Sequence, residues 1–200
     1  MTPHHEAGGA RGEPMPPAVM AAAEGASHHP EESVSFDPRR PGWRFLFSSP
    51  WHMIALGFGS GLPRFAPGTW GTAFAWVSFV VLDRWLDDTG WAAAIAVGFV
   101  LGAVAAQRTG ARLGIIDSGH IVIDEIVAFW IVLWLLPARA SVWTAALAFV
   151  LFRMFDIAKP PPIKRLDARI KNGFGVMLDD VVAAFYTLLL IAIFWRLAHA

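Results

Sequence analysis

Two adjacent carboxylates, Asp124 and Glu125, stand in an otherwise apolar run that ends at Pro137. Burying an ionised carboxylate is costly unless it is paired or bound to a cation. Further acids occur at Asp117 and at the Asp179–Asp180 pair. Carboxylates that gather in one place repel one another unless a cation or protons lie between them. The acidic residues therefore favour a cation-binding site.

Basic residues accompany these acids at regular spacing. Arg153, Asp156 and Lys159 are three residues apart, so a helix would place them roughly on one face. Arg binds phosphate through two parallel donors, and Lys binds it as a point charge. Two glycine-containing turns, at 59–61 and 67–69, offer backbone N–H groups of the kind that bind phosphate oxygens. The predicted phosphate-binding residues are Arg153, Lys159, Ser60, Gly61 and Thr69.

A hard divalent ion would resolve the repulsion between the carboxylates. Mg²⁺ prefers oxygen ligands, typically a few carboxylates with water and substrate phosphate. The predicted metal ligands are Asp117, Asp124, Glu125, Asp156, Asp179 and Asp180. All of these except Asp117 are also the predicted catalytic residues. The combination indicates Mg²⁺-assisted phosphoryl chemistry.

Each group also has a purely structural interpretation. Asp179 and Asp180 could complement a helix dipole, and Arg153 with Asp156 could be an ion pair at a helix end. Asp124 and Glu125 resist such an interpretation, because adjacent helical residues face different directions and one should meet the interior. Ionisable residues inside a membrane are functional candidates by default. His52 and His120 are expected to be hydrogen-bonded rather than catalytic.

Composition excludes several classes of protein. The chain has no cysteine, which rules out disulfides, zinc–thiolate sites and thiol catalysis. Its formal net charge is zero, so we expect no nucleic-acid partner. The sequence contains no HExxH motif, which disfavours a zinc protease.

The elements that must position these residues are apolar. The chain is 56% hydrophobic and 16% charged, with a mean hydropathy of +0.49. Five apolar segments are predicted to be helices, at 69–86, 91–106, 121–136, 141–155 and 181–195. They are slightly shorter than the roughly 20 residues of a spanning helix, but a soluble helix needs a polar face. We therefore predict an all-α, polytopic membrane bundle in which four to five helices span the bilayer.

The flanking segments complete this prediction. Residues 1–42 are rich in Gly, Pro, His and Glu and are predicted to be a disordered tail, leaving residues 43–200 as the membrane-embedded domain. The apolar segment 50–62 is short and interrupted by glycine, as in an interfacial or re-entrant helix.

Basic residues predict the orientation of the bundle. If the five segments alternate in direction, eleven Lys and Arg residues lie on one side and three on the other, which directs the first side to the cytoplasm. The first set is Arg39, Arg40, Arg44, Arg64, Arg108, Arg112, Lys159, Lys164, Arg165, Arg169 and Lys171, and the second is Arg84, Arg139 and Arg196. Five Trp residues then fall near the outer interface: Trp85, Trp91, Trp134, Trp143 and Trp195. The polar motifs all meet the cytoplasmic face.

Four ordered motifs carry a resemblance to a known family. GFGSGLPRFAPGTWGT, DSGHIVIDE, FRMFDIAKPPPIKRLD and NGFGVMLDD resemble the phosphatidylglycerophosphatase A family, from about Pro50 to the C-terminus. The family's acidic, Arg-Asp-Lys-Pro and paired-acid motifs match the predicted site residues in order. Where the family usually has Gly, this chain has Ala128 and Ala184, and the expected Gly-Gly before Gly175 is Asn172-Gly173.

The resemblance implies a bacterial inner-membrane, Mg²⁺-dependent lipid phosphatase. Its substrate would be phosphatidylglycerophosphate in the bilayer, and its products phosphatidylglycerol and phosphate, with the active site facing the cytoplasm. Both a covalent Asp intermediate and a metal-activated water fit the residues, and the number of acids favours water.

Other classes of membrane protein remain as alternatives. A transporter or ion relay could use intramembrane acids, but these acids gather at one face. A CDP-alcohol transferase would need a DGxxAR-type motif, which is absent. A non-catalytic membrane subunit would not require charges to converge.

Overall fold

The computed structural model describes residues 40–137, 140–161, 163 and 170–198, all within the compact unit Phe36–Ala200. Most of the predicted tail, up to residue 39, therefore lies outside the described residues. So do Arg39, Arg139, Lys164, Arg165 and Arg169, on which part of the orientation rests. The orientation stays a prediction.

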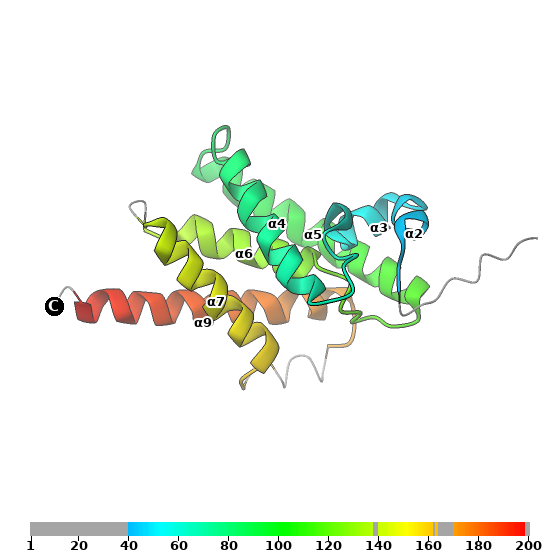
Figure 1. Ribbon diagram of the computed structural model, residues 1–200. Coiled ribbons are helices and arrows are strands. Elements are labelled where there is room, and N and C mark those ends of the chain that lie inside the picture. The colour runs from blue at the N-terminus through cyan, green and yellow to red at the C-terminus, as the bar shows by residue number, and fades with distance from the viewer. Residues whose placement is uncertain (1–39, 138–139, 162, 164–169, 199–200) are drawn as a thin grey trace, which may run out of the picture. The chain divides into compact units, whose positions relative to one another are not determined.

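Every regular element among the described residues is a helix (Figure 1), which confirms the all-α class. The five predicted apolar segments correspond to five helices: α4 (Pro67–Leu82), α5 (Asp88–Leu113), α6 (Ile123–Leu135), α7 (Val142–Ala158) and α9 (Gly173–Ala198). Before them come the short helices α2 (Trp43–Phe47) and α3 (Pro50–Ala55) and the 3₁₀ turn η1 (Gly57–Gly59). The predicted interfacial segment is thus α3 followed by a tight turn.

Local sequence signals explain where the long helices begin and end. Asp87 caps α5 by accepting a 2.8 Å hydrogen bond from the Gly90 N–H, and Gly114 ends that helix in the left-handed region. Ser141 caps α7 in the same way, accepting from the Thr144 N–H. Pro67 opens α4, where a missing N–H is harmless.

Helix α6 lies at the centre of the bundle, in contact with α4, α5, α7 and α9 (Figure 1). Nine of its 13 residues are buried. It is about 20 Å long at 1.5 Å per residue, shorter than a hydrocarbon core of roughly 30 Å. Burial by protein therefore accounts for its nearly uniform hydrophobicity, without requiring contact with lipid.

Among the residues that the structure describes, two helices are long and apolar enough to cross a membrane, α5 with a mean hydropathy of 1.9 and α9 with 2.1 in their most apolar windows. Apolar side chains on both helices are exposed, among them Val100 on α5 and Phe194 on α9. A bundle in contact with membrane is consistent with these two helices. The predicted total of four to five spans is not confirmed, and α4 is a shorter apolar helix.

The predicted belt of Trp residues is divided in the structure. Trp85 and Trp143 are exposed, as an interfacial position requires. Trp91 is instead buried, stacked on Phe79 at 4.3 Å, and its Nε1–H donates to Asp83 Oδ1 at 3.0 Å. Trp91 is therefore covered by protein rather than exposed, because the indole fills space between helices, and its position near an outer interface stays a prediction.

Helix α9 approaches α5 closely at Gly173. A Cβ built at Gly173 would overlap the Ala103 carbonyl oxygen and lie 2.7 Å from the Gln107 backbone nitrogen. The Gly173 N–H also donates to Gln107 Oε1 at 2.8 Å. The first turn of α9 can therefore lie this close to α5 only because Gly173 has no side chain.

We predict that Gly173→Ala lowers the unfolding free energy by about 1–3 kcal/mol, because the new methyl group forces α9 away from α5. Thermal unfolding in detergent, followed by circular dichroism, measures the change. Gly42→Ala is the matched control, since nothing lies within 4 Å of a Cβ there. Equal midpoints for Gly173→Ala and wild type would contradict the close approach.

Candidate active site

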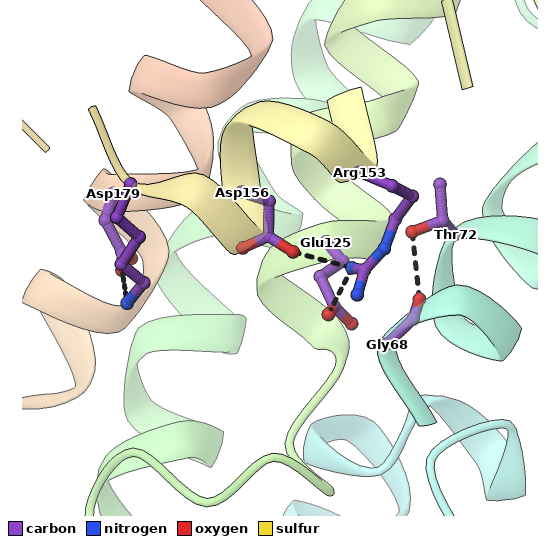
Figure 2. Close-up of polar contacts among 7 residues, drawn as sticks. Gly68, Thr72, Glu125, Arg153, Asp156 and Asp179 are labelled. Atoms are coloured by element: carbon purple, nitrogen blue, oxygen red, sulfur yellow. Dashed lines mark hydrogen bonds and ion pairs between the residues drawn. The ribbon is translucent and has the colours of Figure 1, made fainter. Parts of the chain in front are cut away.

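Arg153 on α7 makes two salt bridges at one end of the bundle, one to α6 and one within α7. Arg153 Nη1 lies 2.7 Å from Glu125 Oε1 and 2.7 Å from Asp156 Oδ2. Figure 2 shows the guanidinium between these two carboxylates. The pairing of Arg153 with Asp156 on its own helix was one structural interpretation of the sequence. The additional bond to Glu125 crosses between helices, so Arg153 also fixes the position of α7 on α6.

Lys159 connects the end of α7 to α9. Its Nζ lies 2.7 Å from Asp179 Oδ2 and 3.8 Å from Asp117 Oδ2. The residue ends α7 in the left-handed region, with φ of 40°, and immediately precedes Pro160. That backbone conformation is costly for a residue with a side chain, and such strain is typical of functional sites. Lys159 thereby turns the chain while its ammonium group reaches α9.

Four carboxylates of the cluster are buried: Asp124 and Glu125 are each 8% exposed, Asp179 is 5% exposed and Asp180 is 3% exposed. Not all of their oxygens are satisfied. Asp124 Oδ1, Glu125 Oε2 and Asp180 Oδ2 have no hydrogen-bond partner, and neither does Arg153 Nε. Buried polar atoms without partners are rare and call for a ligand, an ion or water.

The positions of Asp179 and Asp180 exclude the interpretation that these acids complement the dipole of α9. Helix α9 begins at Gly173, and its first turn contains no acidic residue. Because the dipole effect fades within the first turn, these two acids are not explained as its complement. For Asp179, the ion pair with Lys159 offsets the cost of burying the carboxylate.

The N-terminus of α4 approaches the cluster through two glycines, Gly68 in the predicted 67–69 turn and Gly71, which the sequence analysis did not name. A Cβ at Gly68 would overlap Glu125 Oε1 and lie 2.7 Å from both Nη atoms of Arg153. A Cβ at Gly71 would lie 2.9 Å from Glu125 Oε2. Thr72 Oγ1 donates to the Gly68 carbonyl in the same turn (Figure 2). The spacing of Gly68, Gly71 and Thr72 on one helix face was the available signal.

The glycine-rich turns are more self-contained than the sequence suggested. The N–H of Ser60 donates to the Gly57 carbonyl, that of Gly61 to Leu56, and that of Thr69 to Ala66. The Ser60 hydroxyl also donates to Gly57. These N–H groups already have acceptors, so a phosphate role for Ser60, Gly61 and Thr69 stays a prediction. Gly68, with no acceptor in its own helix, lies closest to Arg153 and Glu125.

The two histidines are hydrogen-bonded, as expected. His52 Nδ1 lies 3.1 Å from the Phe45 carbonyl and 3.0 Å from Ser48 Oγ, and its ring stacks on Phe45 at 4.0 Å. Burial lowers the pKa of His52, with a smaller opposing effect from the Phe45 carbonyl. His120 Nδ1 lies 2.7 Å from the Gly61 carbonyl.

Within the described ranges, no group of three or more His, Asp or Glu side chains is already arranged to hold a metal ion. The six predicted ligands therefore do not form a ready-made cage. Asp117 is more exposed than the others and lies near Lys159. Asp156 forms an ion pair with Arg153. The other four predicted ligands are buried: Asp124, Glu125, Asp179 and Asp180.

The sequence matches a family of known proteins over most of the bundle. The family model for phosphatidylglycerophosphatase A matches residues 53–195. The chain belongs to the phosphatidylglycerophosphatase A family. It is 44% identical over 143 residues to a phosphatidylglycerophosphatase A of Haemophilus influenzae, covering 72% of this chain and 87% of that protein. No solved structure matches.

Two further relatives have similar identity. The phosphatidylglycerophosphatase A of Escherichia coli is 39% identical over 140 residues, covering 70% of this chain and 80% of the relative. A protein of Bacteroides thetaiotaomicron named putative phosphatidylinositol-3-phosphatase is 39% identical over 146 residues, covering 70% of this chain and 91% of the relative. Both matches take in most of the bundle.

The residues at which this chain departs from the family pattern fit the bundle. Ala128 on α6 and Ala184 on α9 are both fully buried in the main hydrophobic core, where these two helices pack against each other. The departure at Asn172 is accommodated too, since its Oδ1 accepts from the Gly175 N–H at 3.0 Å.

We predict that Arg153→Met destabilises the protein by about 3 kcal/mol, because it leaves Glu125 buried without its cation. Combining it with Glu125→Gln should cost at least about 1 kcal/mol less than the sum of the two single changes. Denaturant unfolding in mixed micelles measures the coupling. Arg153→Met combined with Asp88→Asn, an exposed acid on α5, is the additive control. Additivity of Arg153→Met with Glu125→Gln would contradict the ion pair.

Proposed function

We propose that the chain hydrolyses phosphatidylglycerophosphate to phosphatidylglycerol and phosphate, at the cytoplasmic face of a bacterial inner membrane. The observation that carries the proposal is the buried cluster itself. Unsatisfied carboxylate oxygens of Asp124 and Asp180 lie in a site whose cations, Arg153 and Lys159, are already held by other acids. Membership of the family and the names of two relatives support the choice of substrate.

Arg153 and Lys159 are suited to bind the terminal phosphate. Salt bridges hold both side chains in place, so little conformational freedom is lost when a phosphate binds. Both bonds of Arg153 to acids use Nη1, and its Nε is unpartnered. A guanidinium presents its donors as a planar fork that matches phosphate oxygens. Glu125 and Asp156 then act by aiming the guanidinium.

The first turn of α4 adds to this electrostatic environment. Gly68 lies against Arg153 and Glu125, and a helix N-terminus carries partial positive charge. Because Gly68 has no side chain, its backbone can lie directly against Glu125 and Arg153. A phosphate beside Arg153 would thus meet a side-chain cation and a helix terminus together.

Mg²⁺ is the proposed cofactor, and the donor atoms fit it. Mg²⁺ is commonly bound by one or two carboxylates, with water and substrate phosphate completing its shell, so a preformed three-residue cage is not required. Asp124 and Asp180 would hold the ion, since each has a buried oxygen without a partner. When bound, the ion would offset charge on the phosphate and on the clustered acids.

Hydrolysis breaks the bond between phosphorus and the terminal glycerol oxygen. In the proposed reaction a water attacks phosphorus, one of the buried carboxylates accepts its proton, and the same group then gives that proton to the leaving glycerol oxygen. Direct attack by an Asp carboxylate would instead give an acyl phosphate that water then cleaves. The abundance of acids favours attack by water.

The apolar surface suits a lipid substrate. Acyl chains would remain among the exposed apolar side chains while the head group meets the charged end of the bundle, which is the arrangement that a multi-pass protein with a cytoplasmic site would provide. The name of the Bacteroides relative makes a phosphoinositide monoester a second substrate to test.

We predict Mg²⁺-dependent phosphate release from phosphatidylglycerophosphate in detergent micelles, abolished by EDTA and restored by added Mg²⁺. Asp124→Asn should lower the rate at least about a hundredfold while the thermal midpoint stays near that of wild type. Asp88→Asn, an exposed acid whose amide can still accept from Trp134, should keep full activity.

The outcomes separate the alternatives. A well-folded wild type that releases no phosphate from this lipid would contradict the proposal and favour a transporter, an ion relay or a non-catalytic subunit. Faster release from phosphatidylinositol 3-phosphate would move the assignment to that head group.

A further inference from the structure

A basic cavity of about 310 Å³ lies beside the short N-terminal helices. Arg40, Arg64 and His120 line it, together with Trp43 and Leu62. None of the described residues that line it is acidic. Two arginines that line one cavity give it a positive charge, which attracts an anion. The cavity therefore has the charge of an anion-binding site.

The fold brings these residues together from three separate segments. Trp43 on α2 packs over the η1 turn, where a Cβ at Gly59 would lie 3.3 Å from Cζ3 of the indole. Gly59 has a φ of +107°, which favours glycine, so the turn accommodates the ring at this position. The docking of α2 places Arg40, three residues before Trp43, at the same cavity as Arg64 and His120.

The hydrogen bond of His120 fixes the orientation of its ring in the cavity wall. Its Nδ1 lies 2.7 Å from the Gly61 carbonyl oxygen, which can only accept, so Nδ1 carries the proton and donates. The donors for an anion are therefore those of the two arginines. The imidazole is held beside the two arginines, whose planar forks bind phosphate oxygens.

The cavity is connected to the candidate active site by short stretches of chain. Arg64 precedes Gly68 by four residues, and His120 precedes Asp124 by four residues. Four extended residues span at most about 14 Å, so neither segment can be farther from the site than that. Its cations are nonetheless distinct from Arg153 and Lys159.

The surroundings of the cavity favour an anion carried by a lipid. Trp43 is 63% exposed and Phe65, next to Arg64, is 87% exposed. Exposed aromatic rings beside arginines are the combination found at the head-group level of membranes, where anionic lipids attract basic residues. Free phosphate would gain nothing from the aromatic rings.

We propose that Arg40 and Arg64 form a second anion site in the cavity that His120 also lines, and that this site binds the phosphate diester of an anionic phospholipid. The site holds the lipid backbone at the interface beside the catalytic cluster. Phosphatidylglycerophosphate is one such lipid, and only that point rests on the proposed function. Arg40 and Trp43 precede the residues matched by the family model, 53–195, whereas Arg64 and His120 lie within them, so only part of this site falls inside the family match.

The test measures lipid binding, which needs no turnover. Native mass spectrometry of the full chain in detergent would follow retention of added phosphatidylglycerol, with phosphatidylcholine and inorganic phosphate as separate arms. Arg40→Ala/Arg64→Ala is compared with Arg44→Ala/Arg112→Ala, which removes the same charge at exposed positions outside the cavity. We expect the first variant to bind phosphatidylglycerol about tenfold more weakly, and the control to bind like wild type.

Other results would overturn the inference. Equal losses of phosphatidylglycerol binding in both variants would mean that the lipid is attracted by the basic surface as a whole. Unchanged binding in both variants would mean that the cavity binds no lipid. If inorganic phosphate displaced the lipid at equal concentration, the site would be one for free phosphate.

The kinetic consequence is separate from the binding test. For hydrolysis of phosphatidylglycerophosphate, Arg40→Ala/Arg64→Ala should raise KM about tenfold and leave kcat unchanged, because the chemistry uses other cations. A fall in kcat with unchanged KM would contradict a role in lipid binding. Absence of hydrolysis in wild type would end the proposed function while leaving the phosphatidylglycerol result intact.

Discussion

The burial of excess negative charge at one end of the bundle is the constraint on which the rest of the structure depends. Asp124, Glu125, Asp179 and Asp180 are each almost inaccessible, and Arg153 and Lys159 offset only part of their charge. Such a cluster is costly unless a cation, protons or a ligand complete it. Asp124, Glu125 and Asp180 each have one buried oxygen without a hydrogen-bond partner among the described residues, and a cation or a ligand would bind at these oxygens. A site that binds Mg²⁺ and a phosphate together would supply both charges.

The surrounding elements are arranged around that cluster. Asp124 and Glu125 lie in the first turn of α6, the central helix of the bundle. Other helices cover α6 on several sides. Gly68 lets α4 approach the Glu125–Arg153 pair, and Lys159 ends α7 in a strained conformation that reaches Asp179. Ala66, just before α4, is also left-handed, with φ of 47°. Of the three non-glycine residues with positive φ among the described residues, Lys159 belongs to the charged cluster, Ala66 comes just before α4, and Phe58 lies in the η1 turn. The strain at Lys159 is of the kind expected at a functional site.

Much of this arrangement follows from the sequence, and the remainder has identifiable physical causes. Hydrophobic runs located all five helices, but they placed the start of α9 at residue 181 instead of Gly173. Hydropathy falls at Asp179 and Asp180, whereas the helix continues because those side chains are buried and Asp179 is paired. Uniform hydrophobicity also could not distinguish α6, buried by protein, from a helix that faces lipid. The pairing of Arg153 with Glu125 depends on how two helices pack, and three-residue spacing reveals only the partner on the same helix.

Arg153→Lys tests the central claim most directly, because it keeps the positive charge between Glu125 and Asp156 but removes the planar fork. The measurement is the rate of phosphate release from phosphatidylglycerophosphate at saturating lipid and Mg²⁺, alongside the thermal midpoint. If the cluster is a phosphatase centre, kcat should fall about a hundredfold while the midpoint stays close to wild type. An unchanged kcat in a folded Arg153→Lys protein would contradict the account, because the buried ion pairs would then serve the fold alone.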